Sequence, residues 1–529
     1  MVFSLFNLGM ILLLQSGHAQ RHTIDIPPPF NASLAVYQDF QSFSIEFSFF
    51  PDYAGNQSNP NTFSKNLLEN FKNVTGVYPK IRVGGTSQYV ITMQDALVGA
   101  ASYIYVNRDH ADYFPEQEEA VKLIFEHPTD DQPIQINYGP AYFESYHTLG
   151  NVKFFHGLNL NQNHSIQQLT EAATVSCTNI GSHLELYELG NEWNFAHQNY
   201  RPGNYSMDDY VHEWNYKSAA VVAAVQKACP GKFPGFMAPS FVLLDFITSN
   251  GWTADGLYQL GYDRNNLTKI LSFHNYMGVN SPPNPPVDLD LQRTLMNHTS
   301  IVENLAPQIQ RAQNLAYLGL PFTLGETNSI ANQGITGETS VFGDALWLVD
   351  FSLWAAANNI RRLHFHQGLD YRYDSWQPIL SKGQAPTTRP PYYGQIMVAS
   401  VLGKTQDTRI VNIPLSGDTE ATYGIYNGNK VSKVVALNLR ERNATSKENR
   451  PSQQFKFHVP GQHRANIERL TAPGSDSATG VTFGGISYDY ARNNGLPVIV
   501  DGRKETLDVE DEVLSVDVPD SSAVLISFV

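Results

Sequence analysis

The chain has 529 residues, of which 42% are hydrophobic and 16% charged, so it is long enough for one large domain and a smaller one. This composition is that of ordinary globular proteins and excludes a disordered or low-complexity chain. The formal net charge of −15 repels polyanions at long range. It argues against nucleic acid or sulfated glycans as partners and favours a small or weakly charged substrate.

The N-terminus carries a targeting pattern. Residues 2–15 (VFSLFNLGMILLLQ) form an apolar run too short for a membrane span, and small and polar residues follow it up to Ala19. The pattern predicts a signal peptide over residues 1–19 and a secreted, extracellular protein, although the usual Lys or Arg is missing before the run. A buried N-terminal element is the alternative. No second apolar stretch of about 20 residues follows, so we expect no membrane anchor.

Sequons and cysteines agree with secretion. Asn-x-Ser/Thr occurs eight times and predicts glycosylation at Asn31, Asn56, Asn73, Asn163, Asn204, Asn266, Asn297 and Asn443. The chain has two cysteines, Cys177 and Cys229. An oxidising compartment favours one disulfide between them. They lack the spacing of metal ligands, so we expect no zinc site.

Short β-rich runs alternate with amphipathic helical patterns from residue 40 to residue 403. The predicted strands are Phe43–Phe49, Lys80–Gly84, Val152–Leu160, Leu184–Leu189, Phe233–Pro239, Ile270–Tyr276, Phe322–Gly325 and Arg361–His366. The helices between them include Ser165–Thr178, Met207–Lys227, Ile301–Ala316 and Phe342–Ala357. Eight such alternations predict an α/β fold, a (β/α)8 TIM barrel over residues 40–403. A doubly wound open sheet is the alternative, but no Gly-rich phosphate loop follows the first strand.

The pattern changes towards the C-terminus. A Pro-rich stretch, Ala385–Pro391, leads into a last helix over Tyr392–Leu402. Beyond Gly403 alternating strands are separated by turn pairs, which predicts an all-β sandwich domain over residues 404–529. The N-terminal segment 20–39 precedes the barrel, and its residues Thr23–Pro29 could add an edge strand to that sandwich.

Two glutamates stand at the ends of predicted strands. Glu192 follows Leu189-Gly190-Asn191 at the fourth strand, and Glu326 follows Leu324-Gly325 at the seventh. The C-terminal strand ends of a TIM barrel meet at one face, which holds the active site. Two carboxyl groups there suit glycoside cleavage, one as acid and one as nucleophile or base. A single such Glu is more often a helix N-cap or a salt-bridge partner, but two at these positions favour a catalytic pair.

The chain resembles glycoside hydrolase family 79, a retaining family with β-glucuronidases and heparanases. Asn191-Glu192 and Glu326 match the pattern of its clan, in which these strand ends carry the two catalytic carboxylates. Four segments support the family: Phe43–Ser48, Ile81–Thr86 with its Gly84-Gly85-Thr86 turn, Phe154–Asn161, and Phe273–Tyr276 with its His274-x-Tyr276 motif. The resemblance covers the whole mature chain.

The resemblance implies a role for each matching residue. Glu192 would be the general acid/base and Glu326 the nucleophile, with Tyr276 donating a hydrogen bond near Glu326. Glu46 and Asn191 would bind ring hydroxyls. The substrate-binding set would also include Gly85, Thr86 and His274.

In this family, main-chain N–H groups of a loop after the nucleophile, together with a tyrosine, meet the uronic carboxylate, as in an anion nest. The loop here is Ser329–Gly337, with Gly334 as the candidate donor and Tyr371 or Tyr373 as the phenol. The loop departs from some members in lacking an aromatic residue and a glycine pair near its start, which leaves the carboxylate contacts open.

The resemblance implies no metal and no other cofactor. We therefore interpret His364 and His366, at the end of the eighth strand, as part of the pocket wall. Asp350, Asp370 and Asp374 are interpreted as helix caps or solvated charges.

The sequence thus predicts a retaining exo-β-glucuronidase that releases terminal glucuronic acid, or its 4-O-methyl form, with no obligate protein partner. An endo-acting heparanase- or hyaluronidase-like enzyme and a neutral-sugar β-glycosidase of the same clan are the enzymatic alternatives. A carbohydrate-binding protein on an inactive barrel is the alternative outside catalysis.

Overall fold

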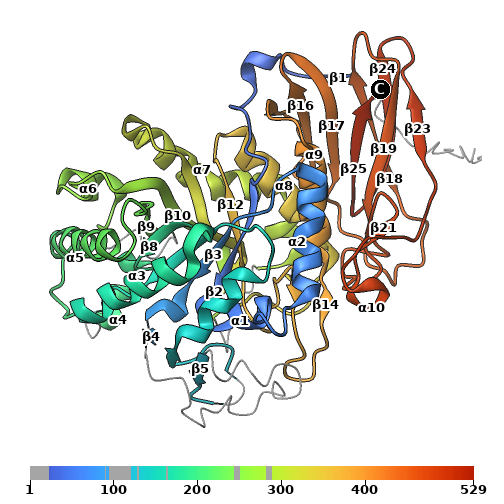
Figure 1. The fold of residues 1–529 in the computed structure, drawn as a ribbon. Helices are drawn as coiled ribbons and strands as arrows, with labels where there is room; N and C mark the ends of the chain where they lie inside the picture. Colours follow the sequence, from blue (N-terminus) through green and yellow to red (C-terminus); the bar gives the residue numbers. More distant parts are fainter. Residues whose placement is uncertain are drawn as a thin grey trace, which may run out of the picture.

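The structure is a computed structural model, and it describes residues 23–89, 91–93, 121–127, 130–161, 165–243, 251–281 and 289–529. The predicted signal peptide and the sequon at Asn163 lie outside these residues. The described chain forms a barrel ringed by helices, with a second unit of β-sheets packed against one side of it (Figure 1).

Eight parallel strands close into a barrel in the order β10-β11-β12-β2-β3-β7-β8-β9. The strand from Leu363 pairs with Gln41 in register, so the last strand closes on the first. The predicted TIM barrel is therefore confirmed. The strands are β2 (Gln41–Glu46), β3 (Ile81–Gly84), β7 (Phe154–Leu158), β8 (Leu184–Leu189), β9 (Phe236–Leu243), β10 (Thr268–Val279), β11 (Phe322–Ala331) and β12 (Leu363–Gln367).

Helices follow the barrel strands and cover the outside of the barrel (Figure 1). Every residue of β2, β3, β7, β11 and β12 is buried, because one face of each strand packs on these helices and the other fills the barrel. The covering helices include α2 (Thr62–Thr75), α3 (Ile166–Ile180), α5 (Met207–Ala228), α6 (Ala254–Gln259), α7 (His298–Asn314), α8 (Phe342–Ala357) and α9 (Pro390–Leu402).

The described part of the connection between β3 and β7 contains elements that the sequence patterns did not predict. It contains a small sheet in the order β4-β6-β5, formed by Ile91–Met93, Gln135–Tyr138 and Val121–Ile124. A 3-10 helix over Pro140–His147 then leads back to β7. The short runs of this excursion fall below the length at which alternation distinguishes a strand from a loop.

The C-terminal unit consists of two sheets around a core of its own, with Phe455, Phe457, Val434 and Ile526 among the buried residues, so the predicted sandwich is confirmed. One sheet has the order β15-β16-β17-β25-β19-β20-β21-β22, with β23 paired to β19, and the other has β1-β18-β24. The strands are β15 (Thr408–Asn412), β16 (Glu420–Asn427), β17 (Lys430–Asn438), β18 (Ser452–His458), β19 (Arg464–Thr471), β20 (Thr482–Phe483), β21 (Ile486–Ser487), β22 (Val498–Ile499), β23 (Glu505–Asp508), β24 (Val513–Pro519) and β25 (Ser522–Phe528).

The N-terminal segment and a polar cluster join the two units. β1 (Ile24–Asp25) pairs in parallel with β18 before the chain enters the barrel. On the barrel side, His298 Nδ1 lies 3.0 Å from the Asp350 carboxylate, which also accepts a 2.5 Å hydrogen bond from the hydroxyl of Tyr423 on β16. The described part of the chain contains no helix that is both long and apolar enough to cross a lipid bilayer.

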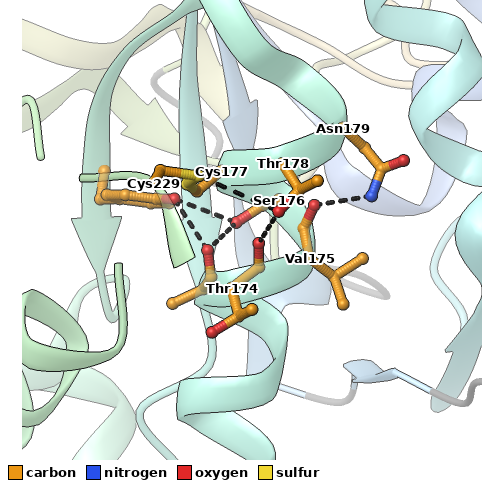
Figure 2. Close-up of a disulfide and its surroundings, with 9 residues drawn as sticks. Thr174, Val175, Ser176, Cys177, Thr178, Asn179 and Cys229 are labelled. Carbon is orange, nitrogen blue, oxygen red and sulfur yellow. Dashed lines mark hydrogen bonds between the residues drawn. A yellow bond between two sulfur atoms is a disulfide. The ribbon is translucent and has the colours of Figure 1, made fainter. Parts of the chain in front are cut away.

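Cys177 and Cys229 form the predicted disulfide, with their Cα atoms 6.6 Å apart. Figure 2 shows the bond, which joins α3 near its end to the residue that caps α5. Thr178 packs beside it, with its hydroxyl 3.9 Å from the Cys229 sulfur. The disulfide therefore links α3 and α5 covalently, the helices before and after β8, which is the strand leading to Glu192.

Candidate active site

Glu192 follows β8 and begins helix α4 (Trp193–Tyr200) in a left-handed conformation, with φ 47° and ψ 40°. Its side chain does not cap this helix, although it occupies the N-cap position. The carboxylate instead turns inwards, where Oε1 lies 2.8 Å from His274 Nδ1 on β10. Its main-chain N–H donates to the carbonyl of Ser240 at 2.8 Å. The helix-cap interpretation of this glutamate is thus wrong, and strain of this kind is typical of functional sites.

Glu326 lies within β11, on the face that points into the barrel mouth. Tyr276 on β10 donates its hydroxyl proton to Glu326 Oε1 at 2.7 Å, so the expected hydrogen bond is present. Arg82 on β3 forms an ion pair with the other oxygen, Oε2. The side chain of Glu326 is 6% exposed and that of Glu192 is 13% exposed, so both can meet a ligand from the same side.

The two carboxylates face each other, with one oxygen of Glu192 and one of Glu326 within 4.8 Å. Burial raises the pKa of Glu192 above its usual value; the hydrogen bond and charge of His274 oppose this rise, and the charge of Glu326 adds to it. The two carboxyl groups therefore cannot both ionise easily.

Glu326 has the opposite shift. Burial alone would raise its pKa, but the positive charges of His366, His274 and Arg82 outweigh burial. The hydrogen bond from Tyr276 adds to their effect, and the pKa of Glu326 lies well below its usual value. Of the two carboxyl groups, Glu326 therefore ionises more readily than Glu192.

Arg82 is the main residue of the site that sequence reasoning missed. It is fully buried, and hydrogen bonds from its guanidinium reach Ser44, Glu188, Asn191 and Glu326. A fully buried arginine inside the short apolar strand Ile81–Gly84 is a signal in itself, because such a charge requires partners.

Glu46 at the end of β2 is held by the turn that the sequence singled out. Its carboxylate accepts the main-chain N–H groups of Thr86 at 3.2 Å and Ser87 at 3.1 Å. Gly85, with φ 90°, sits against it so closely that a Cβ there would lie 2.7 Å from Glu46 Oε2. The expected residues of this turn are therefore brought together, with Thr86 exposed and Glu46 buried behind it.

His366 lies between two acidic side chains. Its Nε2 is 3.4 Å from Glu46 Oε1 and its Nδ1 is 3.7 Å from Glu326 Oε2. Burial alone would lower the pKa of His366, but Glu326 and Glu46 raise it above the usual value. The histidine that we interpreted as pocket wall thus lies between the two carboxylates, which favour its protonated form. His364 is buried one layer below, and burial lowers its pKa well below the usual value.

Asn191, next to Glu192, is fully buried and has protein partners on both ends of its amide. Its Oδ1 accepts from Arg82 Nη2 at 2.6 Å, and its Nδ2 donates to the hydroxyl of Tyr89 at 3.0 Å. Tyr89 in turn donates to the main-chain oxygen of Asn191. The amide is therefore oriented before any ligand arrives.

The loop after β11 adopts three left-handed residues in succession, Asn332, Gln333 and Gly334, with φ 58°, 64° and 74°. The N–H of Gly334 donates to the carbonyl of Ile330 at 3.1 Å, so this donor is used within the loop. Gln333 rather than Gly334 borders the cavity described below. The role of Gly334 as a carboxylate donor therefore stays a prediction, with its N–H paired inside the loop.

Tyr371 and Tyr373 follow β12, with their rings 5.8 Å apart, and both rings lie beside His366. Gln132 donates to the Tyr371 hydroxyl at 3.2 Å, which leaves the hydroxyl proton of Tyr371 free to donate elsewhere. Tyr373 packs against Tyr276, at a ring distance of 6.4 Å.

A cavity of 670 Å³ lies beside the barrel mouth, and neither Glu192 nor Glu326 is among the residues that line it. Residues that follow β3, β8 and β11 line it, because all C-terminal strand ends meet at this face. One wall, residues 130–134, is tied down by Asp131, whose two carboxylate oxygens each lie 2.6 Å from a cation, Arg372 and Lys382. The lining residues are Thr86, Ser87, Asp130, Asp131, Gln132, Pro133, Ile134, Tyr200 and Gln333.

Glu192, His274 and Glu326 each offer a ligand atom within 4.8 Å of the others, a spacing that could hold a metal ion. The surroundings oppose one, since the fully buried guanidinium of Arg82 already pairs with Glu326. A divalent cation would add charge beside a buried cation.

One expectation about acidic residues is wrong. Asp350, Asp370 and Asp374 are not solvated charges but are buried. Asp350 pairs with His298 between the two units, whereas Asp370 accepts from Ser381 and Asp374 accepts the main-chain N–H of Gly368. The last two therefore hold the loop that carries both tyrosines.

Residues 422–525 match the glycosyl hydrolase family 79 C-terminal beta domain. A β-glucuronidase of Aspergillus niger is 38% identical to this chain over 526 residues, which covers 94% of this chain and 92% of that protein. The chain belongs to glycoside hydrolase family 79. A β-glucuronidase of Neurospora crassa is 32% identical over 531 residues, covering 91% of this family 79 chain and 89% of that protein. The family predicted from the sequence and the glycoside hydrolase class are thus confirmed.

Solved structures agree with the fold of this family 79 enzyme. The crystal structure of a 4-O-α-L-rhamnosyl-β-D-glucuronidase from Fusarium oxysporum 12S has a TM-score of 0.73 at 22% identity, over 96% of this chain and 100% of that one. A family 51 arabinofuranosidase from Xanthomonas axonopodis pv. citri has a TM-score of 0.60 at 12% identity, over 96% and 99% of the two chains. At these identities the likeness shows a shared barrel-and-sandwich fold.

Proposed function

We propose that this family 79 enzyme is a retaining exo-β-glucuronidase, in which Glu192 is the general acid/base and Glu326 the nucleophile. The observation that carries the mechanism is the facing pair of carboxyl groups, whose pKa values are shifted in opposite directions. One oxygen of each glutamate lies within 4.8 Å of the other, which suits double displacement between carboxyl groups about 5–5.5 Å apart better than the wider spacing of an inverting enzyme.

In the first step a carboxylate oxygen of Glu326 attacks the anomeric carbon, and the bond to the leaving oxygen breaks as Glu192 gives that oxygen its proton. The products are the free aglycone alcohol and a glycosyl ester of Glu326. In the second step Glu192 takes a proton from water, and the water oxygen attacks the anomeric carbon. The ester breaks, Glu326 is again a carboxylate, and Glu192 is again protonated.

The names of the two curated relatives support glucuronic acid as the terminal sugar. The loop at Gln333 borders the cavity and could supply an uncharged donor for the carboxylate of this sugar, while Tyr371 and Tyr373 lie buried beside His366. Arg372 and Lys382, the cations nearest the wall, are paired with Asp131. Such a neutral donor set binds a carboxylate through oriented dipoles. The wall at residues 130–134 bounds the cavity, which favours a chain end over an internal sugar.

We also propose that the protein is secreted and glycosylated. The apolar N-terminal run, the disulfide and the sequons support this location. Five sequon asparagines are exposed and open to modification: Asn31, Asn73, Asn204, Asn266 and Asn443. Asn56 and Asn297 are half-buried, and each accepts a main-chain hydrogen bond through its side chain. Loss of mass from the secreted protein after N-glycosidase treatment tests the proposal, and an unchanged mass contradicts it.

The test of the activity is hydrolysis of p-nitrophenyl β-glucuronide beside the matched β-glucoside and β-xyloside at pH 4 to 6. We expect turnover of the glucuronide, with the β-anomer of glucuronic acid as the first product in a proton NMR time course. Turnover of a neutral glycoside alone contradicts the substrate, and an α-anomer as first product contradicts the retaining mechanism.

A further inference from the structure

Arg82 is the common partner of groups from three strands and a loop. Its Nη1 donates to Ser44 Oγ at 2.9 Å and pairs with Glu326 Oε2. Its Nη2 donates to Asn191 Oδ1 at 2.6 Å. The guanidinium therefore aims one nitrogen at the proposed nucleophile and the other at the residue beside the proposed acid. Because the arginine side chain is flexible, a further contact is needed to fix its guanidinium in this orientation.

Glu188 on β8 supplies that contact. Its Oε2 lies 2.8 Å from Arg82 Nε and 2.7 Å from Arg82 Nη2, so one oxygen bridges two nitrogens of the fork. The side chains of Glu188 and Arg82 are both fully buried. Glu188 therefore binds the edge of the guanidinium that faces away from Glu326.

The carboxylate of Glu188 is itself fixed from the other side. Ser240 on β9 donates its hydroxyl proton to Glu188 Oε1 at 2.5 Å, and the carbonyl of Ser240 accepts the N–H of Glu192 at 2.8 Å. Gly84 leaves the space that this arrangement needs, because a Cβ there would lie 2.7 Å from Arg82 Nε and 2.8 Å from Glu188 Oε2. The packing leaves the carboxylate little freedom to move.

We propose that Glu188 is a positioning residue: it holds the Arg82 guanidinium so that Nη1 contacts Glu326 while Nη2 orients Asn191. This proposal rests on the proposed function. Glu188 touches neither Glu192 nor Glu326 and acts through Arg82. According to this proposal, the position of the Glu188 carboxylate oxygen matters more for activity than the negative charge of Glu188. A role in charge neutralisation alone would make the charge decisive.

Two substitutions separate place from charge. Glu188→Gln keeps an acceptor oxygen at the same reach and loses the charge, and its amide can donate to Ser240. Glu188→Asp keeps the charge but withdraws the carboxylate by one methylene, about 1.5 Å. The matched control is Glu185→Gln, which lies on the same strand and whose carboxylate also pairs with a cation next to β3, Lys80, outside the site.

We expect Glu188→Asp to lower kcat about 30- to 100-fold, as small misplacements in an active site do, with a smaller change in KM. Arg82 follows the shortened carboxylate away from Glu326, so the acid limb of kcat/KM moves up by about 1 pH unit. Glu188→Gln should keep kcat within about 5-fold of wild type, since position is retained, and should not move the acid limb upwards. Glu185→Gln should match wild type in kcat, KM and pH profile.

The reverse ranking, with Glu188→Asp active and Glu188→Gln impaired, would overturn the proposal, as would wild-type profiles in both variants. Crystal structures of the two variants give a readout that needs no substrate. The proposal requires that Nη1 leave Glu326 in Glu188→Asp and stay in Glu188→Gln. Inactivity of the wild-type enzyme on all three p-nitrophenyl glycosides would count against the proposed function, whereas the orientation of Arg82 would still decide the role of Glu188.

Discussion

Replacing Tyr276 by Phe tests the electrostatics of the site most directly. The substitution removes the 2.7 Å hydrogen bond to Glu326 Oε1 and leaves the ring in place. A hydrogen bond to a charged group contributes about 1.5–3 kcal/mol, and one pKa unit corresponds to about 1.36 kcal/mol. Because the bond stabilises the ionised form, its loss should raise the pKa of Glu326 by about 1–2 units.

The assay is the pH profile of kcat/KM on the glucuronide from pH 7 down to the lowest pH at which the enzyme stays folded, because the pKa of Glu326 lies well below its usual value. The acid limb reports ionisation of the nucleophile in the free enzyme and should shift to higher pH by about 1–2 units in Tyr276→Phe. At pH 6, where Glu326 is ionised in both enzymes, the two should differ much less.

Tyr205→Phe is the matched control, because Tyr205 also donates a 2.7 Å hydrogen bond to a carboxylate, that of Glu213, away from the barrel mouth. An acid limb that stays in place, or moves as far in the control as in Tyr276→Phe, would refute the reasoning.

Three further predictions concern catalysis and stability. Glu326→Gln and Glu192→Gln should each lower kcat by several orders of magnitude with an unchanged circular dichroism spectrum. Azide should partly restore the activity of Glu192→Ala on the p-nitrophenyl substrate by forming a β-glycosyl azide. Full activity in either Gln variant would contradict the assignment. The double change Cys177→Ser and Cys229→Ser removes the disulfide between residues 52 apart in the sequence. It should lower the free energy of unfolding, measured by denaturant titration, by about 4 kcal/mol. Equal stability of the reduced and oxidised wild-type protein would contradict this prediction. Burial raises the pKa of Asp374 to about 8, above its unfolded value, so its contribution to stability is present at low pH and lost as the pH rises from about 4 through 8. Asp374→Asn should therefore make the melting temperature depend less on pH over this range. The same dependence of melting temperature on pH in both proteins would count against this prediction.

The barrel strands could be predicted because each strand is buried on both sides and reads as a local apolar run. Glu192 and Glu326 could be found for the same reason, since each comes one or two residues after a Leu-Gly pair in such a run. The excursion between β3 and β7 could not be predicted, because the pairing of β4, β5 and β6 depends on contacts that the local sequence does not encode.

The role of Arg82 could not be predicted for a different reason. Its partners Ser44, Glu188 and Glu326 lie on β2, β8 and β11, which are not adjacent in the sheet and come together only across the inside of the closed barrel. No spacing along the chain relates them. The sequence does hold a weaker signal, since Arg82 and Glu188 are charged residues inside apolar strands, and two such residues on nearby strands of one barrel can be expected to pair.

The difference between the two carboxyl groups follows from where each is attached. Glu326 lies within a strand, at a level where Arg82 and His366 reach it from β3 and β12, so cations surround its oxygens. Glu192 lies three residues beyond its strand, in a left-handed turn, and His274 is the basic side chain that contacts its carboxylate. The acid and basic limbs of the activity profile should therefore respond differently to substitution. Changes at His366 act on the acid limb through Glu326, whereas changes at Arg82 or His274, whose charges act on both carboxyl groups, should move both limbs.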